Sequence, residues 1–220
     1  MRPPPPTVFL VRHGHVHNPR GVLYGRLPRF PLSARGREEA ARAAGILAGA
    51  KLAAVYTSPR LRARQTAAAI AALHPGLAVR TSRLLDEVRT RFEGEPLSML
   101  AGRRDDFYTG EGPPWEQPQD LVRRMVRFLE RLRRRHAGEA VAAVTHGDVI
   151  AFTLLWAMRR ELRPENKTRL AIPGGGGYPP TGAVVRLVLP PGWPKRPAEI
   201  AFLPGGGAEA APPHGGASTR

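Results

Sequence analysis

Short apolar segments alternate with helical patterns along this chain, and no other feature constrains its fold as strongly. Three segments have the β-branched and small apolar residues of buried strands, namely TVFLV (7–11), LAAVYTS (52–58) and EAVAAVTH (139–146). Apolar residues at helical spacing follow each of them, within 31–50, 59–73 and 149–162. This alternation predicts an α/β fold, a three-layer α/β/α sandwich around a mostly parallel central sheet.

Local signals support these elements and add others. Ser33 is placed to cap the first helix, and Pro59 suits the first turn of the second. Weaker strand patterns lie at 76–80 and 182–189, and residues 120–136 form a strongly amphipathic helical pattern. We expect the arginines of that last helix to form a solvated face.

The length and composition favour one domain. A chain of 220 residues with 42% hydrophobic content is long enough to bury one sizeable core. We expect this domain to cover residues 1–190 and to include an irregular segment at 88–120. After Pro190 the Pro and Gly content rises, so residues 191–220 are expected to form a poorly ordered tail.

The composition also excludes several classes of site. The chain has no cysteine, which excludes disulfides, zinc sites built on thiolates and a cysteine nucleophile. No run approaches the roughly 18 apolar residues that cross a bilayer, and the start MRPPPPTVFL has prolines where a signal peptide has its apolar core. We therefore expect a soluble, cytoplasmic protein without a membrane partner.

The formal net charge of +16 raises the question of a nucleic-acid partner. The basic residues are almost all arginine, and they are spread along the chain rather than gathered in one arm. We therefore attribute the charge to compositional bias and a solvated surface, and we do not expect nucleic acid to be the partner. A preference for anionic ligands follows in either case.

Polar side chains follow four of the predicted strands at the points where the strands end. They are Arg12 and His13, Ser58 and Arg62, Asp86 and Glu87, and His146. Ligands of open α/β sheets bind beyond the carboxyl ends of the strands, so we expect these side chains to meet at one edge of the sheet. The sequence therefore predicts a site at that edge.

These residue types favour phosphoryl transfer. Guanidinium groups such as those of Arg12 and Arg62 offer forked donors that match phosphate oxygens. A neutral imidazole, with an ordinary pKa of about 6.5, is a competent nucleophile near neutral pH. A neighbouring carboxylic acid can protonate the leaving alkoxide, and cations already in place can stabilise the transition state without a metal.

Four motifs occur along the chain in the order LVRHGHVHN (10–18), TSPRLRARQTA (57–67), LLDEV (84–88) and VTHGD (144–148). Together they resemble the signatures of the histidine phosphatase superfamily, also called phosphoglycerate mutase-like. The resemblance extends over residues 7–190. It implies the phosphoglycerate mutase-like fold, a catalytic histidine, and neither a metal nor another cofactor.

The resemblance also implies roles for individual residues. His13 is implied as the nucleophile, which becomes a phosphohistidine. The residues implied to bind the phosphoryl oxygens are Arg12, Arg62, Asn18 and His146. Glu87 matches the proton donor of the family, which would later activate the water that hydrolyses the phosphohistidine.

Three positions depart from the family pattern or compete with it. Asp86 is a second candidate for the proton donor, and the position within LLDEV favours Glu87. The family most often has Glu or Thr where this chain has His15, and its Asn lies six residues after the nucleophile rather than five. We expect His15 to hydrogen-bond within the pocket and His17 to face solvent.

The substrate pocket is expected to draw on two further segments. Tyr24 and Arg26 are expected to line its mouth, as the matching loop does in the family. Residues 88–120 are expected to form a lid over the leaving group. The aromatic residues expected to recognise that group are Phe107, Tyr108 and Trp115.

The expected function is that of a metal-independent phosphomonoesterase acting on a small-molecule phosphate ester, and three alternatives stay open. A phosphoglycerate mutase-type phosphotransferase is the nearest, although EVRTRFEGEPLS (87–98) does not resemble the longer segment of the mutases. A metal-dependent hydrolase would use His13 and His15 as ligands, but Arg12 would repel a dication there. The third is a non-catalytic phosphate- or nucleic-acid-binding protein. The sequence indicates neither the natural substrate nor the oligomeric state.

Overall fold

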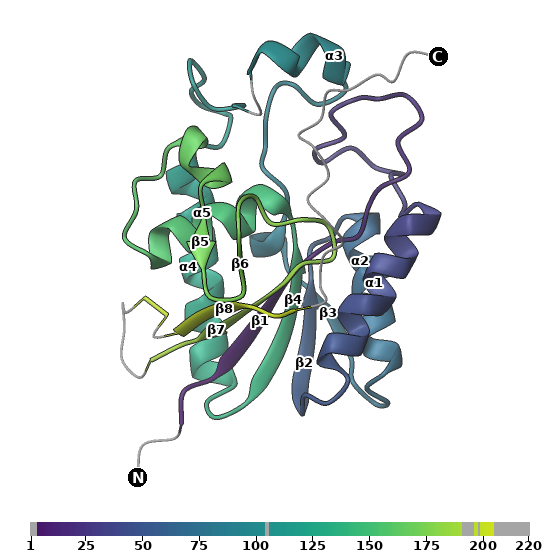
Figure 1. Ribbon diagram of the computed structural model, residues 1–220, viewed down its shortest axis with the longest axis vertical. Coiled ribbons are helices and arrows are strands. Elements are labelled where there is room, and N and C mark those ends of the chain that lie inside the picture. The colour runs from purple at the N-terminus through teal and green to yellow at the C-terminus, as the bar shows by residue number, and fades with distance from the viewer. Residues whose placement is uncertain (1–3, 104–105, 191–195, 198, 205–220) are drawn as a thin grey trace.

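A six-stranded sheet forms the centre of the computed structural model, which describes residues 4–103, 106–190, 196–197 and 199–204 (Figure 1). Its strands are β1 (Thr7–Arg12), β2 (Leu52–Thr57), β3 (Val79–Thr81), β4 (Ala140–Thr145), β7 (Val184–Val188) and β8 (Glu199–Phe202), in the spatial order β3-β2-β4-β1-β7-β8. The pairs β1–β4, β2–β4 and β2–β3 are parallel, and β7 is antiparallel to both of its neighbours. The predicted mostly parallel sheet is confirmed.

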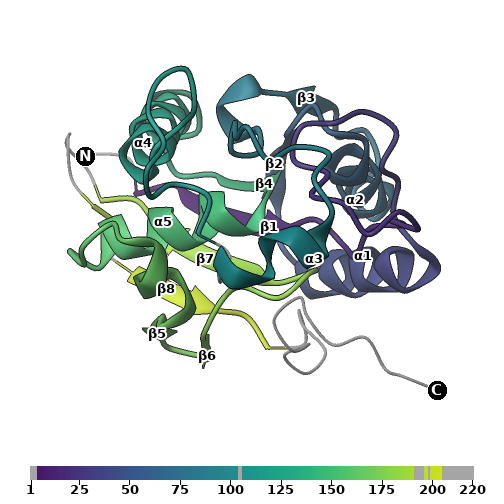
Figure 2. The ribbon, with the colours of Figure 1, turned by 90° about the horizontal axis from the view of Figure 1, so that it is seen from above.

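Helices cover both faces of this sheet (Figure 2). Helices α1 (Ala34–Leu47) and α2 (Leu61–Ala72) pack on one face, and α4 (Pro118–Arg135) and α5 (Gly147–Ala157) pack on the other. Alternate residues of β1 face opposite layers: Val8 and Leu10 join the core under α4 and α5, whereas Phe9 and Val11 join the core under α1 and α2. A sheet buried on both faces explains why its strands read as continuous apolar runs.

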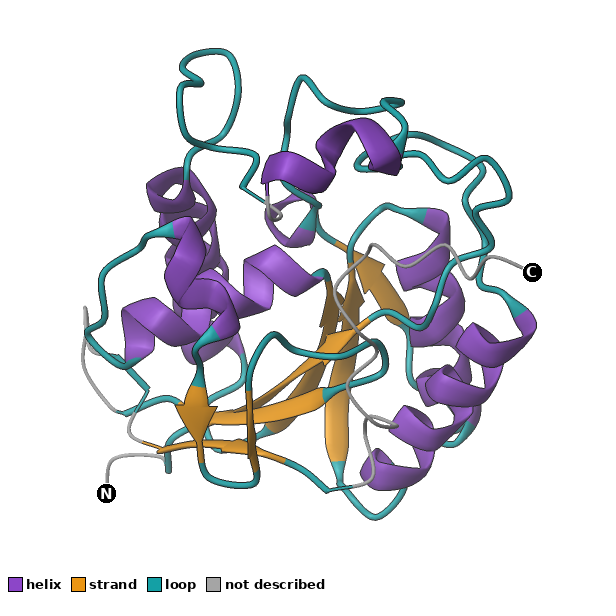
Figure 3. Ribbon diagram, turned by 45° about the horizontal axis from the view of Figure 1, so that its top comes forward, coloured by secondary structure: helices purple, strands orange, loops and turns teal. Residues whose placement is uncertain are grey.

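The remaining elements are short and lie in the connections. They are η1 (Arg83–Leu85), α3 (Leu97–Leu100), η2 (Ala101–Arg103), η3 (Pro164–Thr168), β5 (Ala171–Ile172) and β6 (Gly175–Gly176), and β5 pairs with β6 in a separate small sheet. In Figure 3, α3 and the long loops lie together on one side of the central sheet, at the top of the view.

Helix ends follow the capping signals with small shifts. The hydroxyl of Ser33 accepts the N–H of Gly36 (3.0 Å), as predicted for the cap of α1. Helix α2 begins at Leu61 rather than at the predicted Pro59, because Arg60 still has an extended backbone. Helix α4 begins at Pro118 with a capping box between Gln117 and Asp120.

The prediction of a poorly ordered tail over 191–220 is wrong for β8. This strand pairs with β7, with Val185 opposite Phe202, and the Phe202 side chain is buried in the core under α4 and α5. The prolines and glycines on both sides of EIAF concealed a short edge strand, because pairing on one side suffices to order such a strand. The other parts of the predicted tail, residues 191–195, 198 and 205–220, lie outside the described residues.

The helices in the described part of the chain are too short or too polar to cross a bilayer.

Candidate active site

His13 is the first residue after β1, and its side chain is almost fully buried. Its Nδ1 lies 2.8 Å from the carbonyl oxygen of Gly14. A carbonyl oxygen only accepts hydrogen bonds, so Nδ1 carries the ring proton and Nε2 presents its lone pair to the site. Nε of Arg62 lies 3.1 Å from this Nε2. The lone pair of His13 Nε2 and the guanidinium group of Arg62 therefore face one another.

Two glycines allow α1 to pack directly against the loop that carries His13. A Cβ atom at Gly14 would lie 2.2 Å from the carbonyl oxygen of Gly36, and one at Gly36 would lie 1.9 Å from that of His15. The backbones therefore touch where other residues would hold them apart. The carboxylate of Glu39, which is buried in α1, also accepts the backbone N–H of His15 (2.7 Å).

Arg62 lies in the first turn of α2 and is fully buried, and its guanidinium group reaches the centre of the site. Nη2 donates to the carbonyl oxygen of Gly25 (2.8 Å), and it also lies 3.2 Å from Nδ1 of His146. The guanidinium group stacks on the ring of Tyr24, 4.6 Å from its centroid. These contacts hold one arginine in a single orientation.

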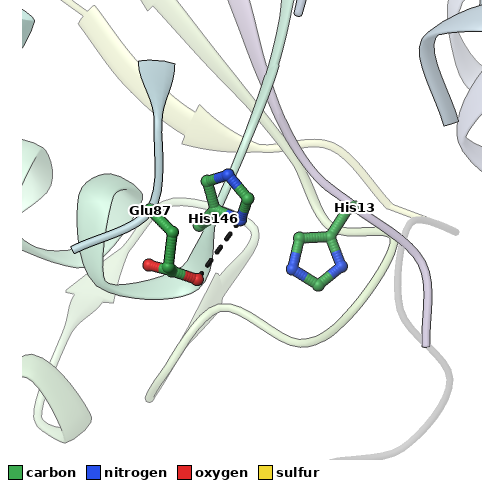
Figure 4. Close-up of side chains that lie close together, drawn as sticks. All are labelled: His13, Glu87 and His146. Carbon is green, nitrogen blue, oxygen red and sulfur yellow. Dashed lines mark ion pairs between the residues drawn. The ribbon is translucent and has the colours of Figure 1, made fainter. Parts of the chain in front are cut away.

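His146 and Glu87 complete the cluster from two other segments (Figure 4). His146 follows β4, and its ring packs edge-on against that of His13 with 5.1 Å between centroids. Oε2 of Glu87 lies 3.2 Å from Nδ1 of His146 and 3.4 Å from Nη2 of Arg62. The structure thus brings together three of the predicted site residues, His13, Glu87 and His146, around Arg62.

Both histidines are neutral near pH 7. Burial lowers the pKa of His13 well below its ordinary value, and the charges of Arg62 and Arg12 lower it further. Burial likewise lowers the pKa of His146 to about 4, although Glu87 opposes the shift. A neutral His13 keeps its Nε2 lone pair available for attack.

Glu87 is ionised when the site is empty. Burial raises its pKa, but His146 and Arg62 lower it by more, so the pKa lies well below the ordinary value. A phosphate dianion bound at Arg62 would offset the positive charge of this arginine and raise the pKa of Glu87 again, which would favour its protonated form.

Arg12 is the last residue of β1 and lies beside the cluster, and one of its N–H donors, Nε, makes no hydrogen bond within the described residues. Its Nη1 donates to the carbonyl oxygen of Pro179 (2.6 Å), and its guanidinium group lies over the ring of Tyr178, 5.0 Å from the centroid. Its Nε is buried without a hydrogen-bond partner among the described residues. An oxyanion is the kind of ligand that such a donor favours.

Asp86 serves a different purpose from Glu87. Its carboxylate forms an ion pair with Arg60 (Nε to Oδ1, 2.8 Å) and lies 3.4 Å from the hydroxyl of Ser58. It also accepts the backbone N–H of Glu87 (2.9 Å). These bonds anchor the loop after η1, and the geometry therefore favours Glu87 over Asp86 as the proton donor.

Arg26, which is predicted to line the mouth of the pocket, is bonded to the loop that carries Glu87. Its Nε donates to the backbone carbonyl of Glu87 (2.7 Å), and its Nη2 pairs with Glu116 (2.7 Å). Glu116 also pairs with Arg124 of α4 (3.0 Å), whose Nη2 reaches the same carbonyl of Glu87 (3.3 Å). The 88–120 segment is thus joined through Glu116 to the loop that carries the acid.

Two predicted residues are not brought into the cluster. The side-chain amide of Asn18 donates to the carbonyl oxygen of Val22 (2.8 Å) and accepts its N–H (3.3 Å), so it holds the loop together. His15 has an exposed side chain whose Nδ1 lies 2.8 Å from the hydroxyl of Ser33, at the cap of α1. Their predicted parts in phosphate and substrate binding stay predictions.

The three aromatic residues predicted to recognise the leaving group, Phe107, Tyr108 and Trp115, make different contacts in the structure. Tyr108 is buried, and its hydroxyl donates to Asp148 (2.5 Å). Phe107 packs against Phe92, with 6.1 Å between centroids. Trp115 lies beneath the guanidinium group of Arg89, 5.6 Å from it. Tyr108 is therefore fixed within the structure.

The family follows from comparison of the sequence. A profile of the Histidine phosphatase superfamily (branch 1) matches residues 8–174, which is most of the chain. The chain belongs to this superfamily. The histidine phosphatase motifs found along the sequence all fall within the matched residues, and they supply the cluster described above.

Individual relatives agree with this assignment. The Mycobacterium tuberculosis protein Rv0525, which is uncharacterised, is 43% identical over 146 residues, which cover 63% of this chain and 72% of the relative. Phosphoglycerate mutase-like protein 4 of Arabidopsis thaliana is 31% identical over 157 residues, which cover 65% of this chain and 67% of the relative.

Solved structures share the fold of this chain. Bacillus stearothermophilus YhfR superposes with a TM-score of 0.72 at 23% identity and covers 92% of this chain and 98% of its own. Phosphoserine phosphatase of Entamoeba histolytica superposes with a TM-score of 0.68 at 21% identity. The superposition covers 90% of this chain and 96% of the phosphoserine phosphatase. The predicted phosphoglycerate mutase-like architecture is confirmed.

The charge of Arg62 disfavours a cation site at this cluster. Nitrogen and oxygen atoms of His13, Glu87 and His146 lie within 4.8 Å of one another, so these side chains could in principle ligate a metal. The guanidinium group of Arg62 contacts all three, however, and its positive charge would oppose a dication there. The same charge attracts a phosphoryl group.

Several residues of the site have no assigned role in the sequence analysis. Asp148 and Tyr178 lie beside Arg12 and His146, and Glu116 joins Arg26 to Arg124. Asp148 belongs to the motif VTHGD, which is the one local signal that could have drawn attention to it. Tyr178 and Glu116 lie in loops without a motif, so their partners are known only from the structure.

Proposed function

We propose that this histidine phosphatase is a metal-independent phosphomonoesterase that hydrolyses a small-molecule phosphate ester through a phosphohistidine on His13. The observation that carries the proposal is the bond from Nδ1 of His13 to Gly14 (2.8 Å), which leaves Nε2 facing Arg62 at 3.1 Å. A nucleophile and a phosphate-binding cation therefore share one point, and a proton donor, Glu87, lies beside them.

In the first step the phosphoryl group binds to Arg12, Arg62 and His146. Nε2 of His13 forms a bond to phosphorus while the bond from phosphorus to the leaving oxygen breaks. Glu87, protonated in the complex, gives its proton to that oxygen, so the product leaves as an alcohol. The guanidinium groups stabilise the charge that develops on the equatorial oxygens.

In the second step a water molecule replaces the alcohol. The Glu87 carboxylate takes a proton from this water, the water oxygen bonds to phosphorus, and the bond from phosphorus to Nε2 breaks. Inorganic phosphate leaves, and His13 returns to its neutral form. Each group thus ends the cycle in its starting protonation state once Glu87 has released its proton.

The substrate class is proposed from charge and from the relatives. The site is rich in arginine, and structural relatives include a phosphoserine phosphatase crystallised with 3-phosphoglyceric acid and a mycobacterial glucosyl-3-phosphoglycerate phosphatase. We therefore propose small phosphate esters that carry a further anionic group. A panel of phosphorylated acids, sugar phosphates and nucleoside monophosphates would rank these classes.

The central experiment measures phosphate release from p-nitrophenyl phosphate and from this panel, with a chelator present. We expect turnover that resists the chelator, and a phosphoryl adduct on His13 after rapid acid-free quenching and mass spectrometry. His13→Ala should abolish both, whereas His17→Ala, an exposed histidine in the same loop, should retain them. Turnover by His13→Ala, or loss of activity with the chelator, would refute the mechanism.

Phosphotransfer is a second candidate, because a 31% identical relative is named phosphoglycerate mutase-like. Product analysis separates the two. Release of inorganic phosphate supports the hydrolase, whereas recovery of the phosphoryl group on an organic acceptor supports the transferase.

A further inference from the structure

A buried carboxylate lies directly behind the phosphate site and is not used by the mechanism above. Asp148 is in the first turn of α5, two residues after His146, and is almost fully buried. The ammonium group of Lys167, also buried, lies 3.0 and 3.1 Å from its two oxygens. The hydroxyls of Tyr108 and Tyr178 donate to the same carboxylate at 2.5 and 2.6 Å.

Tyr178 connects this carboxylate to the phosphate clamp. One end of its side chain, the hydroxyl, bonds to Asp148, and the face of its ring supports the guanidinium group of Arg12 at 5.0 Å. The next residue, Pro179, accepts a hydrogen bond from Nη1 of Arg12 (2.6 Å). Arg12 is thus held by two consecutive residues of one loop.

Gly147 explains how Tyr178 comes so close to α5. A Cβ atom at Gly147 would lie 2.3 Å from the Tyr178 hydroxyl, and no side chain could occupy that space. The motif VTHGD therefore has a structural meaning in its last two positions. The glycine leaves room for the tyrosine, and the aspartate accepts its hydrogen bond.

We propose that Asp148 and Tyr178 are positioning residues, which hold Arg12 in the orientation that binds the phosphoryl group. The inference rests on the proposed function, because it assigns to Arg12 the role of phosphate ligand. Tyr108, which bonds to the same carboxylate from the 88–120 segment, ties that segment to α5 but does not bear on Arg12.

The charges of Asp148 and Lys167 explain how Tyr178 can hold the guanidinium group of Arg12. Lys167 compensates the buried charge of Asp148, which would otherwise be costly to bury. A phenol that donates a short bond to a carboxylate gains electron density on its ring. An electron-rich ring face attracts the Arg12 guanidinium group more strongly, without neutralising it as a direct ion pair would.

The test compares two Tyr→Phe substitutions that remove chemically similar bonds. Tyr178→Phe deletes the bond to Asp148 and keeps the ring, whereas Tyr56→Phe deletes a bond to Nε2 of His136 (2.9 Å), away from Arg12. Binding of inorganic phosphate is measured by calorimetry, and kcat and KM are measured with p-nitrophenyl phosphate. Melting temperatures verify that each variant is folded.

We expect Tyr178→Phe to weaken phosphate binding about tenfold, the usual effect of losing a bond to a charged group. Tyr56→Phe should leave phosphate binding unchanged even where it lowers the melting temperature. Asp148→Asn should behave as Tyr178→Phe does. If it fails to fold, Asp148→Asn combined with Lys167→Met removes both buried charges and serves in its place.

A double-mutant cycle with Arg12→Ala completes the test. If Tyr178 acts through Arg12, Tyr178→Phe should weaken phosphate binding no further once Arg12 has been removed. The inference would be overturned if the losses of phosphate affinity from Tyr178→Phe and Arg12→Ala were additive. It would also be overturned if Tyr178→Phe bound phosphate as tightly as the wild type. Neither result would contradict the proposed phosphatase function. A wild type that binds phosphate but releases none from any ester would refute the proposed function alone. A wild type that does not bind phosphate would refute both.

Discussion

The hydroxyl of Ser58 lies 2.7 Å from Nε2 of His146, on the side of the ring opposite the nitrogen that faces Glu87 and Arg62. Ser58 follows β2 and is fully buried. The ionised carboxylate of Glu87 only accepts hydrogen bonds, so the neutral imidazole of His146 carries its proton on Nδ1, and its Nε2 accepts a hydrogen bond from Ser58. Ser58 thus holds the ring from the side opposite Glu87.

Ser58→Ala should lower kcat about tenfold, because the imidazole of His146 loses the hydroxyl that bonds to Nε2 and holds the ring in place. Ser33→Ala is the matched control, since that hydroxyl caps α1 instead. It should lower the free energy of unfolding by about 1 kcal/mol and leave kcat unchanged. Steady-state kinetics and urea unfolding measure the two effects, and an unchanged kcat in Ser58→Ala would contradict the assignment.

Arg62→Lys should lower kcat/KM about a hundredfold or more, although the positive charge is kept. A lysine cannot place donors at His13 Nε2 and at the carbonyl of Gly25 at once, as Nε and Nη2 of the arginine do. Arg64→Lys changes an exposed arginine of the same helix and should be neutral. Equal activities of the two variants would exclude a phosphate-binding role for Arg62.

Glu87→Gln should affect esters according to their leaving groups. Hydrolysis of an alkyl phosphate should slow about a hundredfold or more, because its alkoxide needs a proton, whereas p-nitrophenyl phosphate, with a good leaving group, should be affected less. Asp86→Asn should lower stability, through the loss of its ion pair with Arg60 (2.8 Å), without this dependence on the leaving group. The opposite pattern would make Asp86 the proton donor.

Two glycines of α1 should respond to alanine with opposite signs. Gly36→Ala should lower the free energy of unfolding by about 1–3 kcal/mol, because the new methyl would collide with the carbonyl oxygen of His15. Gly45 has nothing within 4 Å of the position of such a methyl, so Gly45→Ala should raise stability by about 0.5–1 kcal/mol. Urea unfolding of both variants measures the difference, and the same sign in both would contradict the packing.

The free energy of unfolding should fall as the pH drops from 6.5 toward 4. The folded-state pKa of His146 is about 4, below its ordinary value, so in this range the unfolded chain takes up a proton that the folded protein does not. The loss from this one group is about 3 kcal/mol. His13, whose pKa is also lowered by burial, adds to the loss in the same direction.

Urea unfolding at pH 7 and pH 4.5 measures this dependence. His146→Gln, which does not titrate, should reduce it, and His17→Gln, at an exposed position, should not. If all three proteins lose the same stability between the two pH values, the buried histidine is not the cause.

The central strands and their order of appearance were predictable, because burial on both faces leaves a continuous apolar run in the sequence. Arg12, His13, Arg62, Glu87 and His146 were predictable as a site, since parallel strands deliver the residues at their carboxyl ends to one edge. The strand β8 was missed because an edge strand needs only one paired side, and its four residues lie among prolines and glycines. The strand pattern of these four residues is too short to be recognised in a segment whose Pro and Gly content predicts an irregular chain.

The sequence by itself therefore determined that Arg12, His13, Arg62, Glu87 and His146 meet at one edge of the sheet, because each of them lies at or shortly after the end of a strand. Only the tertiary structure decided what holds them. The bond from Arg26 to the carbonyl of Glu87 is one such contact, which the sequence did not predict. Tyr178 supports Arg12 across 166 residues of chain, and such a contact depends on how loops pack together, which leaves no local pattern.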